Sequence, residues 1–394
     1  MKVNLAVSAH NSADWERVQA KAFDKPSKVH DADYVDLGIA LGELAEPLGF
    51  DGIWAPEHFG TPYAMSPNAL QVLAYFAART ERVSLGTMVL VLPWWNPVRL
   101  AHQIAYLDII SKGRYDTIGL GRGVAKTEFE ALGVPREESR IRFEECLDII
   151  GLALTQEQFE YDGQIFKIPP SQLRPQPRST DLMSRLYGAS STNTSLEIMA
   201  RRGLKPLFVG NKPMEEAAKD VKLVNQFRQE EGLPPCQSKN ILFMYCTANS
   251  AESEVTKGYI STANRDVMMH YGFADPTAFA GVKGYEAYAA GQAAATALAT
   301  NGGGAANVGT DSTYDLSNLL IGTPDTIIER IKEGQRLCSY SEITVIPHFG
   351  EMSREDAERS LRLFAQEVLP VVQKMDTPLH APSLPDPRPE TVSA

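Results

Sequence analysis

Short apolar runs alternate with longer segments of helical periodicity along most of the chain. Leu37, Leu41, Leu44 and Leu48 recur at the three- and four-residue spacing of a helix that buries one face. The intervening runs are rich in Val, Ile and Leu, as is typical of parallel strands covered on both sides. Eight strands are predicted, over residues 3–8, 52–56, 83–92, 115–120, 186–189, 207–210, 240–247 and 342–346.

Eight strands that alternate with helices favour an α/β fold closed into a (β/α)₈ barrel. An open doubly wound sheet is the alternative, but its Gly-x-Gly-x-x-Gly fingerprint is missing after the first strand. We expect one barrel domain over residues 1–375. It carries two insertions, a small hairpin with an extended tail at 159–176 and an Ala/Gly-rich candidate lid at 273–317. The proline-containing C-terminal tail, 376–394, is expected to be flexible.

Composition excludes several classes of protein. The 394 residues are 43% hydrophobic, enough for a large core, yet no apolar stretch reaches the roughly 18 residues of a membrane span. The N-terminus does not resemble a signal peptide, so we predict a cytoplasmic protein. A net charge of −11 argues against a nucleic-acid partner. The four cysteines are widely spaced and predict neither a disulfide framework nor a metal site.

Polar residues follow several predicted strands at the end where barrel enzymes carry their chemistry. Arg122 stands between Gly121 and Gly123, and a guanidinium in such a turn suits the geometry of a phosphate. The hydroxyl-rich residues 190–195 run into a helix, whose N-terminus favours an anion, although they would also serve as a simple helix cap. His58 follows Glu57, which is predicted to orient it as a group that titrates near neutrality.

Several ordered motifs together resemble the bacterial luciferase-like flavin monooxygenases. They cover most of the chain apart from the two insertions and the tail. The motifs lie at residues 45–58, 85–87, 92–93, 96–99, 107–108, 111–114, 119–123, 203, 321–324 and 367–370.

The resemblance implies a (β/α)₈ barrel that binds reduced FMN, supplied by a separate NAD(P)H:flavin reductase, and activates O₂ as a flavin C4a-hydroperoxide. It implies hydroxylation or Baeyer-Villiger oxygenation of a small, largely apolar or aromatic substrate. It also implies a homodimer formed through helices beside the second and third strands. Two alternatives stay open: hydride transfer with a deazaflavin, as in other members of the superfamily, and a flavin-binding relative that has lost catalysis.

The same resemblance suggests roles for individual residues. His58 matches the catalytic histidine, and Phe59 replaces a second histidine. Gly121 stands where the light-emitting subunit has a reactive cysteine, so light emission is not implied. Thr87 and Met88 fall where relatives carry a non-prolyl cis peptide under the flavin ring. The implied cofactor-binding residues are Thr87, Met88, Gly121, Arg122, Gly123, Val124, Ser190, Ser191, Thr192 and Ser195. The predicted substrate pocket comprises Phe59, Tyr63, Met65, Trp94 and Trp95.

Overall fold

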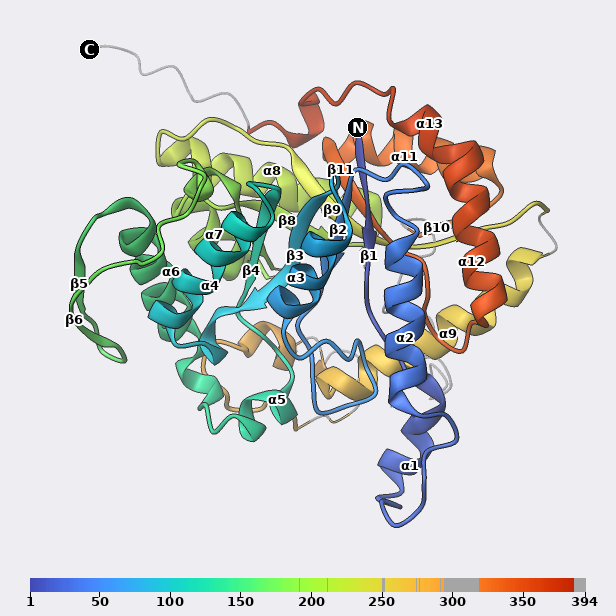
Figure 1. Ribbon diagram of the computed structural model, residues 1–394, viewed down its shortest axis with the longest axis horizontal. Helices are drawn as coiled ribbons and strands as arrows, with labels where there is room; N and C mark the ends of the chain where they lie inside the picture. Colours follow the sequence, from blue (N-terminus) through green and yellow to red (C-terminus); the bar gives the residue numbers. More distant parts are fainter. Residues whose placement is uncertain are drawn as a thin grey trace.

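The computed structural model describes residues 1–190, 192–210, 212–249, 252–273, 275, 277–290, 292–293 and 319–385. Eight parallel strands form a barrel, in the order β11-β1-β2-β3-β4-β7-β8-β9, which closes where β9 pairs with β11 (Figure 1). The predicted barrel of eight strands is therefore confirmed. The strands are β1 (Lys2–Ala6), β2 (Gly52–Ala55), β3 (Ser84–Val91), β4 (Tyr115–Gly121), β7 (Leu186–Ala189), β8 (Lys205–Val209), β9 (Ser238–Cys246) and β11 (Tyr340–Ile346).

Helices surround the barrel in Figure 1, and local sequence fixes where several of them begin. The side chains of Asn68, Asn96, Thr323 and Ser353 each accept a hydrogen bond from a backbone N–H of the first helical turn. The helices are α1 (Trp15–Gln19), α2 (Asp31–Glu43), α3 (Ala69–Arg79), α4 (Pro97–Ile110), α5 (Lys126–Ala131), α6 (Ser139–Thr155), α7 (Asn193–Arg201), α8 (Met214–Glu230), α9 (Glu252–Tyr271), α11 (Pro324–Cys338), α12 (Arg354–Leu363) and α13 (Leu369–Val372).

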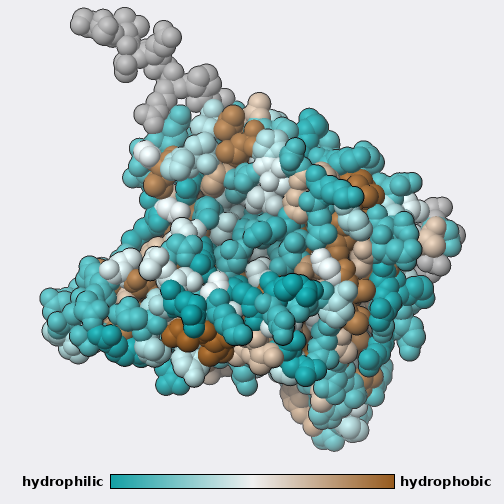
Figure 2. Space-filling model, turned by 45° about the horizontal axis from the view of Figure 1, so that its top comes forward, coloured by the Kyte–Doolittle hydropathy of each residue, from teal (hydrophilic) through white to brown (hydrophobic). Residues whose placement is uncertain are grey.

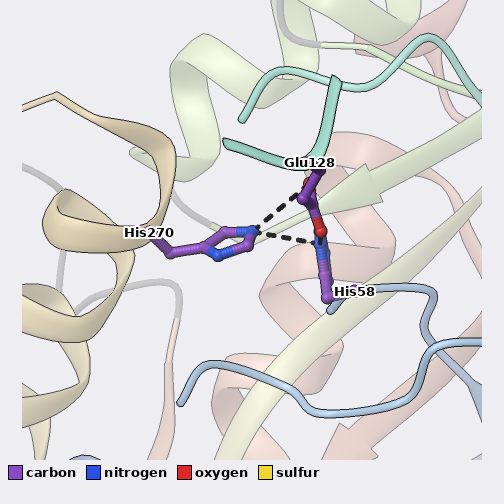
Figure 3. Close-up of side chains that lie close together, drawn as sticks. All are labelled: His58, Glu128 and His270. Carbon is purple, nitrogen blue, oxygen red and sulfur yellow. Dashed lines mark hydrogen bonds and ion pairs between the residues drawn. The ribbon is translucent and has the colours of Figure 1, made fainter. Parts of the chain in front are cut away.

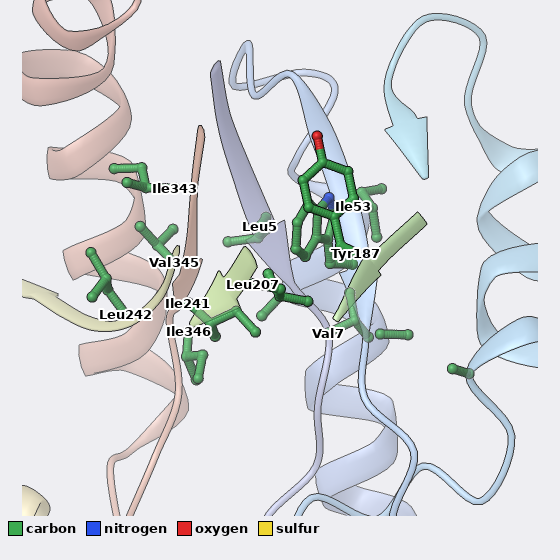
Figure 4. Close-up of a cluster of buried hydrophobic side chains, with 14 of the residues drawn as sticks. Leu5, Val7, Ile53, Tyr187, Leu207, Ile241, Leu242, Ile343, Val345 and Ile346 are labelled. Carbon is green, nitrogen blue, oxygen red and sulfur yellow. The ribbon is translucent and has the colours of Figure 1, made fainter. Parts of the chain in front are cut away.

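Branched aliphatic side chains from the strands form the core. Figure 4 shows Leu5, Ile53, Leu207, Ile241 and other side chains of this cluster, most of them from the strands of the barrel. Leu5, Ile53 and Leu207 are completely buried. Burial of this kind contributes about 1.5–3 kcal/mol for each large aliphatic side chain. The apolar runs that predicted the strands thus supply the buried side chains of the core.

The first insertion is the expected hairpin. Its antiparallel strands β5 (Phe159–Asp162) and β6 (Lys167–Ser171) lie beside α6. The buried Glu145 of α6 holds the turn, because its carboxylate accepts backbone N–H groups of residues 164–166. One short strand was not predicted: β10 (Leu320–Gly322) pairs with β9 outside the closed barrel. Three residues are too few to show a strand pattern.

The beginning of the C-terminal tail packs against the barrel. Residues 377–383 lie against α8 and α11 and are held by several hydrogen bonds. The carbonyl of Pro378 accepts from Gln335, that of Ser383 accepts from Asn225, and the backbone N–H of His380 donates to Ser339. The structure therefore docks residues 377–383 on the barrel, the flexibility of the tail stays a prediction, and residues 386–394 lie outside the described chain.

The second insertion, 273–317, is described only at 273, 275, 277–290 and 292–293. Phe279, Tyr285 and Ala278 of this segment form a small buried cluster of their own, separate from the main core. The face in Figure 2 is mostly hydrophilic, with separate apolar areas. Among the described residues, no helix has both the length and the hydropathy needed to cross a membrane.

Candidate active site

A cavity of about 280 Å³ opens at the C-terminal ends of the barrel strands. Residues at the ends of β3, β4, β7 and β8 and in the segments after β2, β4, β7 and β8 line it, together with residues of α8 and α9. Most of the predicted site residues meet there. The predicted residues that line the cavity are Glu57, His58, Tyr63, Met88, Gly121, Arg122, Gly123, Val124, Ser190 and Ser195. Ser191 lies outside the described residues.

Arg122 is a buried cation without a counter-ion. Its exposed fraction is 9%, and no carboxylate of the described residues lies within ion-pair distance. Its Nη1 atom is buried and has no hydrogen-bond partner. The guanidinium lies 4.2 Å from the ring centre of Tyr285. Burial lowers the pKa of Arg122, but an arginine stays protonated in proteins. A buried guanidinium with an unused donor that lines a cavity fits an anionic group such as a phosphate.

The hydroxyl-rich loop before α7 is a second feature, beside Arg122, that suits an anion. Thr192 is the N-cap residue of α7, yet its side chain does not bond the helix backbone. Its Oγ1 donates to Ser195 Oγ at 3.1 Å, and its N–H donates to Ser190 Oγ at 3.2 Å. The simple helix-cap interpretation therefore fails for Thr192. Ser190 and Ser195 line the same cavity as Arg122, so the loop and the guanidinium can act on one ligand.

A bulge in β3 shapes the floor of the cavity. The pairing of β3 with β4 shifts between Thr87 and Leu90, and the peptide bond between Met88 and Val89 is cis. The resemblance placed this bond at Thr87-Met88, so the expected position was one residue early. Met88 and Val89 line the cavity, but the Thr87 hydroxyl bonds Gly119 N (3.0 Å) and Gly119 O (3.1 Å) instead. Thr87 therefore joins two strands.

His58 belongs to a cluster of polar side chains that come from three different elements (Figure 3). Its Nδ1 lies 3.0 Å from Glu128 Oε1 of α5 and 3.1 Å from His270 Nε2 of α9. Its Nε2 lies 3.1 Å from the hydroxyl of Tyr271. The backbone of His58 is fixed by two hydrogen bonds with Ser66. His58 is the member of the three residues in Figure 3 that lines the cavity.

Burial and neighbouring charges set the protonation of this cluster. Burial raises the pKa of Glu128, but attraction to His58 and hydrogen bonds with both histidines outweigh it and lower the pKa to about 2. Burial lowers the pKa of His270 to about 4, despite the nearby Glu128. At neutral pH we therefore take Glu128 as ionised and His270 as neutral.

Glu57 does not orient His58, contrary to our expectation. Its Oε2 accepts from Val91 N at 2.7 Å and from Trp95 Nε1 at 3.1 Å. Burial raises the pKa of Glu57 to about 8, against the effect of these two bonds. Glu57 therefore fixes the chain after β3, and Glu128 is the carboxylate that contacts His58.

The predicted substrate residues separate into two groups. Tyr63 lines the cavity, whereas Phe59, Met65, Trp94 and Trp95 do not belong to its lining. Phe59 packs edge-on against Trp94, with ring centres 5.3 Å apart. Tyr271 of α9, which the sequence did not indicate, also lines the cavity, as do Phe273 and Tyr288 from the segment predicted as a lid.

Glu128, His270 and Tyr271 were missed by reasoning from the sequence. Glu128 is one of two acidic residues in the short helix α5, and it belongs to none of the motifs found in the sequence. His270 lies more than 200 residues from His58, and only the closed barrel brings α9 beside the loop after β2. The sequence does carry one signal, since Glu128 stands six residues after Arg122 in a segment that begins at a strand end.

The fold and the cavity define a (β/α)₈ barrel whose mouth holds a buried arginine and a histidine. The family model described as luciferase-like monooxygenase matches residues 18–340. The chain belongs to this family.

Curated relatives agree with this assignment. An uncharacterised protein of Sinorhizobium fredii is 26% identical over 87% of this chain and 93% of its own length. The alkanal monooxygenase alpha chain of Photobacterium leiognathi is 28% identical over 58% of this chain and 63% of its own. A third relative is the oxygenase component of the flavin-dependent trigonelline monooxygenase of Acinetobacter baylyi. It is 30% identical over 46% of this chain and 51% of its own length. The matches thus span less than two thirds of the two named enzymes.

Solved structures show the same fold. Monooxygenase RslO1 from Streptomyces bottropensis has a TM-score of 0.71 and 24% identity, over 94% of this chain and 100% of its own. A second structure is the oxygenating constituent of 3,6-diketocamphane monooxygenase from Pseudomonas putida, a type II Baeyer-Villiger enzyme in complex with FMN. It has a TM-score of 0.66 and 20% identity, over 96% of this chain and 99% of its own. An F420-dependent secondary alcohol dehydrogenase has a TM-score of 0.62 and 13% identity, over 93% and 98%.

Proposed function

We propose that this protein is the oxygenase component of a two-component flavin monooxygenase. It takes reduced FMN from a separate NAD(P)H:flavin reductase in the cytoplasm and uses O₂ to oxygenate a small, largely apolar or aromatic compound. The observation that carries the proposal is the buried, unpaired guanidinium of Arg122 beside a hydroxyl-rich loop, within a family of flavin monooxygenases.

The residues of the cavity fit the phosphate of FMN. Arg122 offers donors without a partner, Ser190 and Ser195 offer hydroxyls, and the first backbone N–H groups of α7 have no side-chain cap from Thr192. Reduced FMN, when bound, supplies the electrons that activate O₂. The protein contributes the anion site, an apolar floor at Met88 and Val89, and walls that exclude water.

His58 is the residue we propose for proton handling. With a proton on Nδ1 directed at the ionised Glu128, its Nε2 is the basic ring atom. Tyr271 places its hydroxyl 3.1 Å from this atom and also lines the cavity. A proton can therefore be held at Nε2 and exchanged with the cavity. Glu128 orients the ring, which is the role that we had assigned to Glu57.

The lining of the cavity supports the proposed class of substrate. Its walls include Tyr63, Tyr271, Phe273 and Tyr288, and its interior apolar side chains include Met199. These aromatic walls favour a small apolar or aromatic molecule, while the charged side chains Arg122, Lys212 and Asp220 line the same cavity. The structural likeness to a Baeyer-Villiger enzyme is a likeness of fold, so hydroxylation and Baeyer-Villiger oxygenation both stay within the proposal.

A homodimer is part of the proposal. Tyr75 of α3 and Tyr106 and Ile110 of α4 are exposed large side chains on two neighbouring helices, of which α3 lies beside β2 and β3. Exposed apolar groups of this kind are common at protein interfaces. Light scattering coupled to size-exclusion chromatography measures the mass directly, and a monomer at micromolar concentration would contradict this part.

The decisive experiment is an anaerobic titration of the purified protein with photoreduced FMN, followed by rapid mixing with oxygenated buffer. We expect tight binding and a transient absorbing species distinct from oxidised FMN. Arg122→Met should weaken binding by tenfold or more, as expected for loss of a charged hydrogen bond worth about 1.5–3 kcal/mol. Arg79→Met, which removes an exposed guanidinium on α3, is the matched control and should bind as the wild type does.

The outcomes separate the alternatives. Binding of a reduced deazaflavin but not of reduced FMN would move the protein to the hydride-transfer branch. Binding of FMN without any oxygen-dependent species would favour a flavin-binding relative without catalysis. Equal affinities of wild type and Arg122→Met would remove the assigned phosphate site.

A further inference from the structure

Three side chains of the types that ligate transition metals converge beside the cavity. They are His58 from the loop after β2, Glu128 from α5 and His270 from α9 (Figure 3). Glu128 is 1% exposed and His270 2%. The separations are 3.0 Å for His58 Nδ1 and Glu128 Oε1, 3.1 Å for His58 Nδ1 and His270 Nε2, and 3.6 Å for His270 Nε2 and Glu128 Oε2. The two imidazole nitrogens and both carboxylate oxygens of Glu128 thus face one small space.

Hydrogen bonds alone do not satisfy these atoms. His58 Nδ1 faces both Glu128 Oε1 and His270 Nε2, yet a neutral imidazole nitrogen carries at most one proton. Glu128 Oε2 is buried and has no hydrogen bond of 3.5 Å or shorter among the described residues, since His270 Nε2 lies 3.6 Å from it. A buried carboxylate oxygen without a donor is costly, and so are two lone pairs that point at each other. A cation between the three atoms removes both costs.

The outer atoms of the same side chains have partners of the kind seen around metal ligands. His270 Nδ1 lies 2.7 Å from Thr61 Oγ1, and His58 Nε2 lies 3.1 Å from the Tyr271 hydroxyl. If each outer nitrogen carries the proton, both inner nitrogens present lone pairs. Glu128 Oε1 also accepts from Phe59 N at 3.1 Å, which fixes the carboxylate. Outer partners that set the tautomer and the ring orientation are characteristic of histidine metal sites.

We propose that His58, Glu128 and His270 form a site for a divalent transition-metal ion of the zinc or cobalt type. Zinc lies about 2.0–2.1 Å from nitrogen and 2.0–2.2 Å from oxygen, so tetrahedral ligand atoms are roughly 3.3 Å apart. The separations of 3.0, 3.1 and 3.6 Å lie on both sides of that value, and the last of them is measured to the second carboxylate oxygen of Glu128. Two neutral imidazoles and one carboxylate are the ligand set of several zinc enzymes. His58 lines the cavity, which provides an entry path and a direction for a water ligand.

This site goes beyond the flavin chemistry proposed above. The ion takes the lone pair of His58 Nδ1 in place of a proton, so the bound metal fixes the ring that handles protons in the flavin reaction. We therefore expect the metal to lower monooxygenase activity and a chelator to restore it. Flavin binding depends on Arg122, so failure of the metal site leaves the flavin titration unaffected, and the two proposals can fail separately.

The test is a titration of the full-length protein, first stripped of metal with a chelator, with Zn²⁺ in a calorimeter and with Co²⁺ followed by visible absorption. We expect one ion per chain and the intense visible bands of four-coordinate Co²⁺. His270→Ala and Glu128→Gln each remove one ligand and should weaken binding by at least tenfold. Thr61→Val, which removes an outer partner, should weaken it by about 10–100-fold.

Two controls keep the result interpretable. His102→Ala removes a half-buried histidine of α4 that bonds the Val98 carbonyl, and its affinity for Zn²⁺ should equal that of the wild type. Zn²⁺ should raise the unfolding temperature of the wild type and of His102→Ala but not of Glu128→Gln, and this comparison also shows whether each variant folds. No binding by the wild type, or unchanged binding in both ligand variants, would overturn the site.

Discussion

Arg114 and Arg122 stand at opposite ends of β4, and their guanidinium groups are used in different ways. The guanidinium of Arg114 donates to the carbonyls of Ala77, Thr80, Val83 and Ser111 and to the Thr80 hydroxyl, at 2.7–3.0 Å. That of Arg122 has a buried nitrogen with no hydrogen-bond partner among the described residues. The first arginine ties the end of α3 to the start of β4, whereas the second keeps its donors for a ligand.

Matched substitutions should separate these two roles. We expect Arg114→Met to lower the free energy of unfolding by about 2–4 kcal/mol, because several buried carbonyls lose a charged donor. Arg122→Met should leave it unchanged or slightly higher, since a buried cation without a partner is costly. Urea unfolding followed by circular dichroism measures both values. An equal loss in Arg122→Met would show that its guanidinium serves the fold rather than a ligand.

Asp266 of α9 should make the stability depend on pH. Burial raises its pKa from 3.8 to about 6, although Ser12 and Arg265 bond the carboxylate. The folded state therefore holds a proton that the unfolded state has lost between these values. The protonated Asp266 thereby stabilises the folded state by an amount on the order of 3 kcal/mol. This contribution is fully present below pH 3.8, declines as the pH rises and is lost above about pH 6.

The comparison with Asp266→Asn isolates this effect. The difference in free energy of unfolding between wild type and variant should fall as the pH rises from about 4 to 6 and stay constant above that. The decline due to Glu57, whose pKa is raised to about 8, is common to both proteins and cancels. A difference that does not change between pH 4 and 6 would rule out the raised pKa.

At the scale of elements, β3 and β4 approach each other unusually closely at the bulge. A Cβ atom on Gly119 would lie 2.1 Å from the carbonyl oxygen of Thr87, a contact that real structures do not contain. The sequence suggested that the glycines of residues 119–123 leave room for a phosphate. The structure shows another reason for a glycine at position 119: a side chain there would collide with the backbone of Thr87 in β3.

Gly119→Ala should therefore be among the most destabilising single substitutions in the barrel. We expect a loss of about 3 kcal/mol or more, because backbone rather than a mobile side chain must shift. Gly258→Ala is the matched control, since no atom lies within 4 Å of its added Cβ in α9. It should raise the free energy of unfolding by about 0.5–1 kcal/mol through helix propensity. Thermal unfolding of both variants checks the pair.

Prediction from the sequence succeeded where the signal is local. The strands are continuous apolar runs, and the hairpin of residues 159–171 is bounded by turn residues, so both were visible. The bulge in β3 and the docking of residues 377–383 depend on contacts with distant segments. Glu128 and His270 reach His58 only after the barrel has closed. Arg122 was found because its glycine neighbours mark a strand end, whereas the missed residues lie in ordinary helical patterns.

At the scale of the whole molecule, charged side chains close the end of the barrel opposite the cavity. Lys239 of β9 bonds Thr117 of β4 at 2.6 Å and Glu342 of β11 at 2.8 Å. Its ammonium also lies 4.4 Å from the ring centre of Tyr187 of β7. These residues stand near the N-terminal ends of their strands. The barrel interior is filled on that side, so a ligand of the cavity enters from the C-terminal ends of the strands.

On the cavity side, Tyr285 fastens residues 277–290 to the barrel. Its hydroxyl donates to Gly123 O at 2.9 Å and contacts Ser139 Oγ at 3.1 Å. Its ring lies 4.2 Å from the guanidinium of Arg122 and 4.9 Å from that of Arg136. The residue that holds this segment thus also covers the proposed phosphate site.

Removal of the Tyr285 side chain should release the segment without unfolding the barrel. We expect Tyr285→Leu to raise the rate of limited tryptic cleavage after the exposed Lys283 by about 10–100-fold, because the cation–π contacts and hydroxyl bonds together contribute roughly 1–3 kcal/mol against local opening. Tyr285→Phe keeps the ring and should show a smaller increase, while Tyr106→Leu, which alters a 57% exposed tyrosine of α4, should show none. Mass spectrometry of the fragments gives each rate. Cleavage of Tyr285→Leu at the wild-type rate would contradict this role of Tyr285. It would mean that Phe279 and the other apolar side chains hold the segment, and that loss of the ring over Arg122 does not open the cavity.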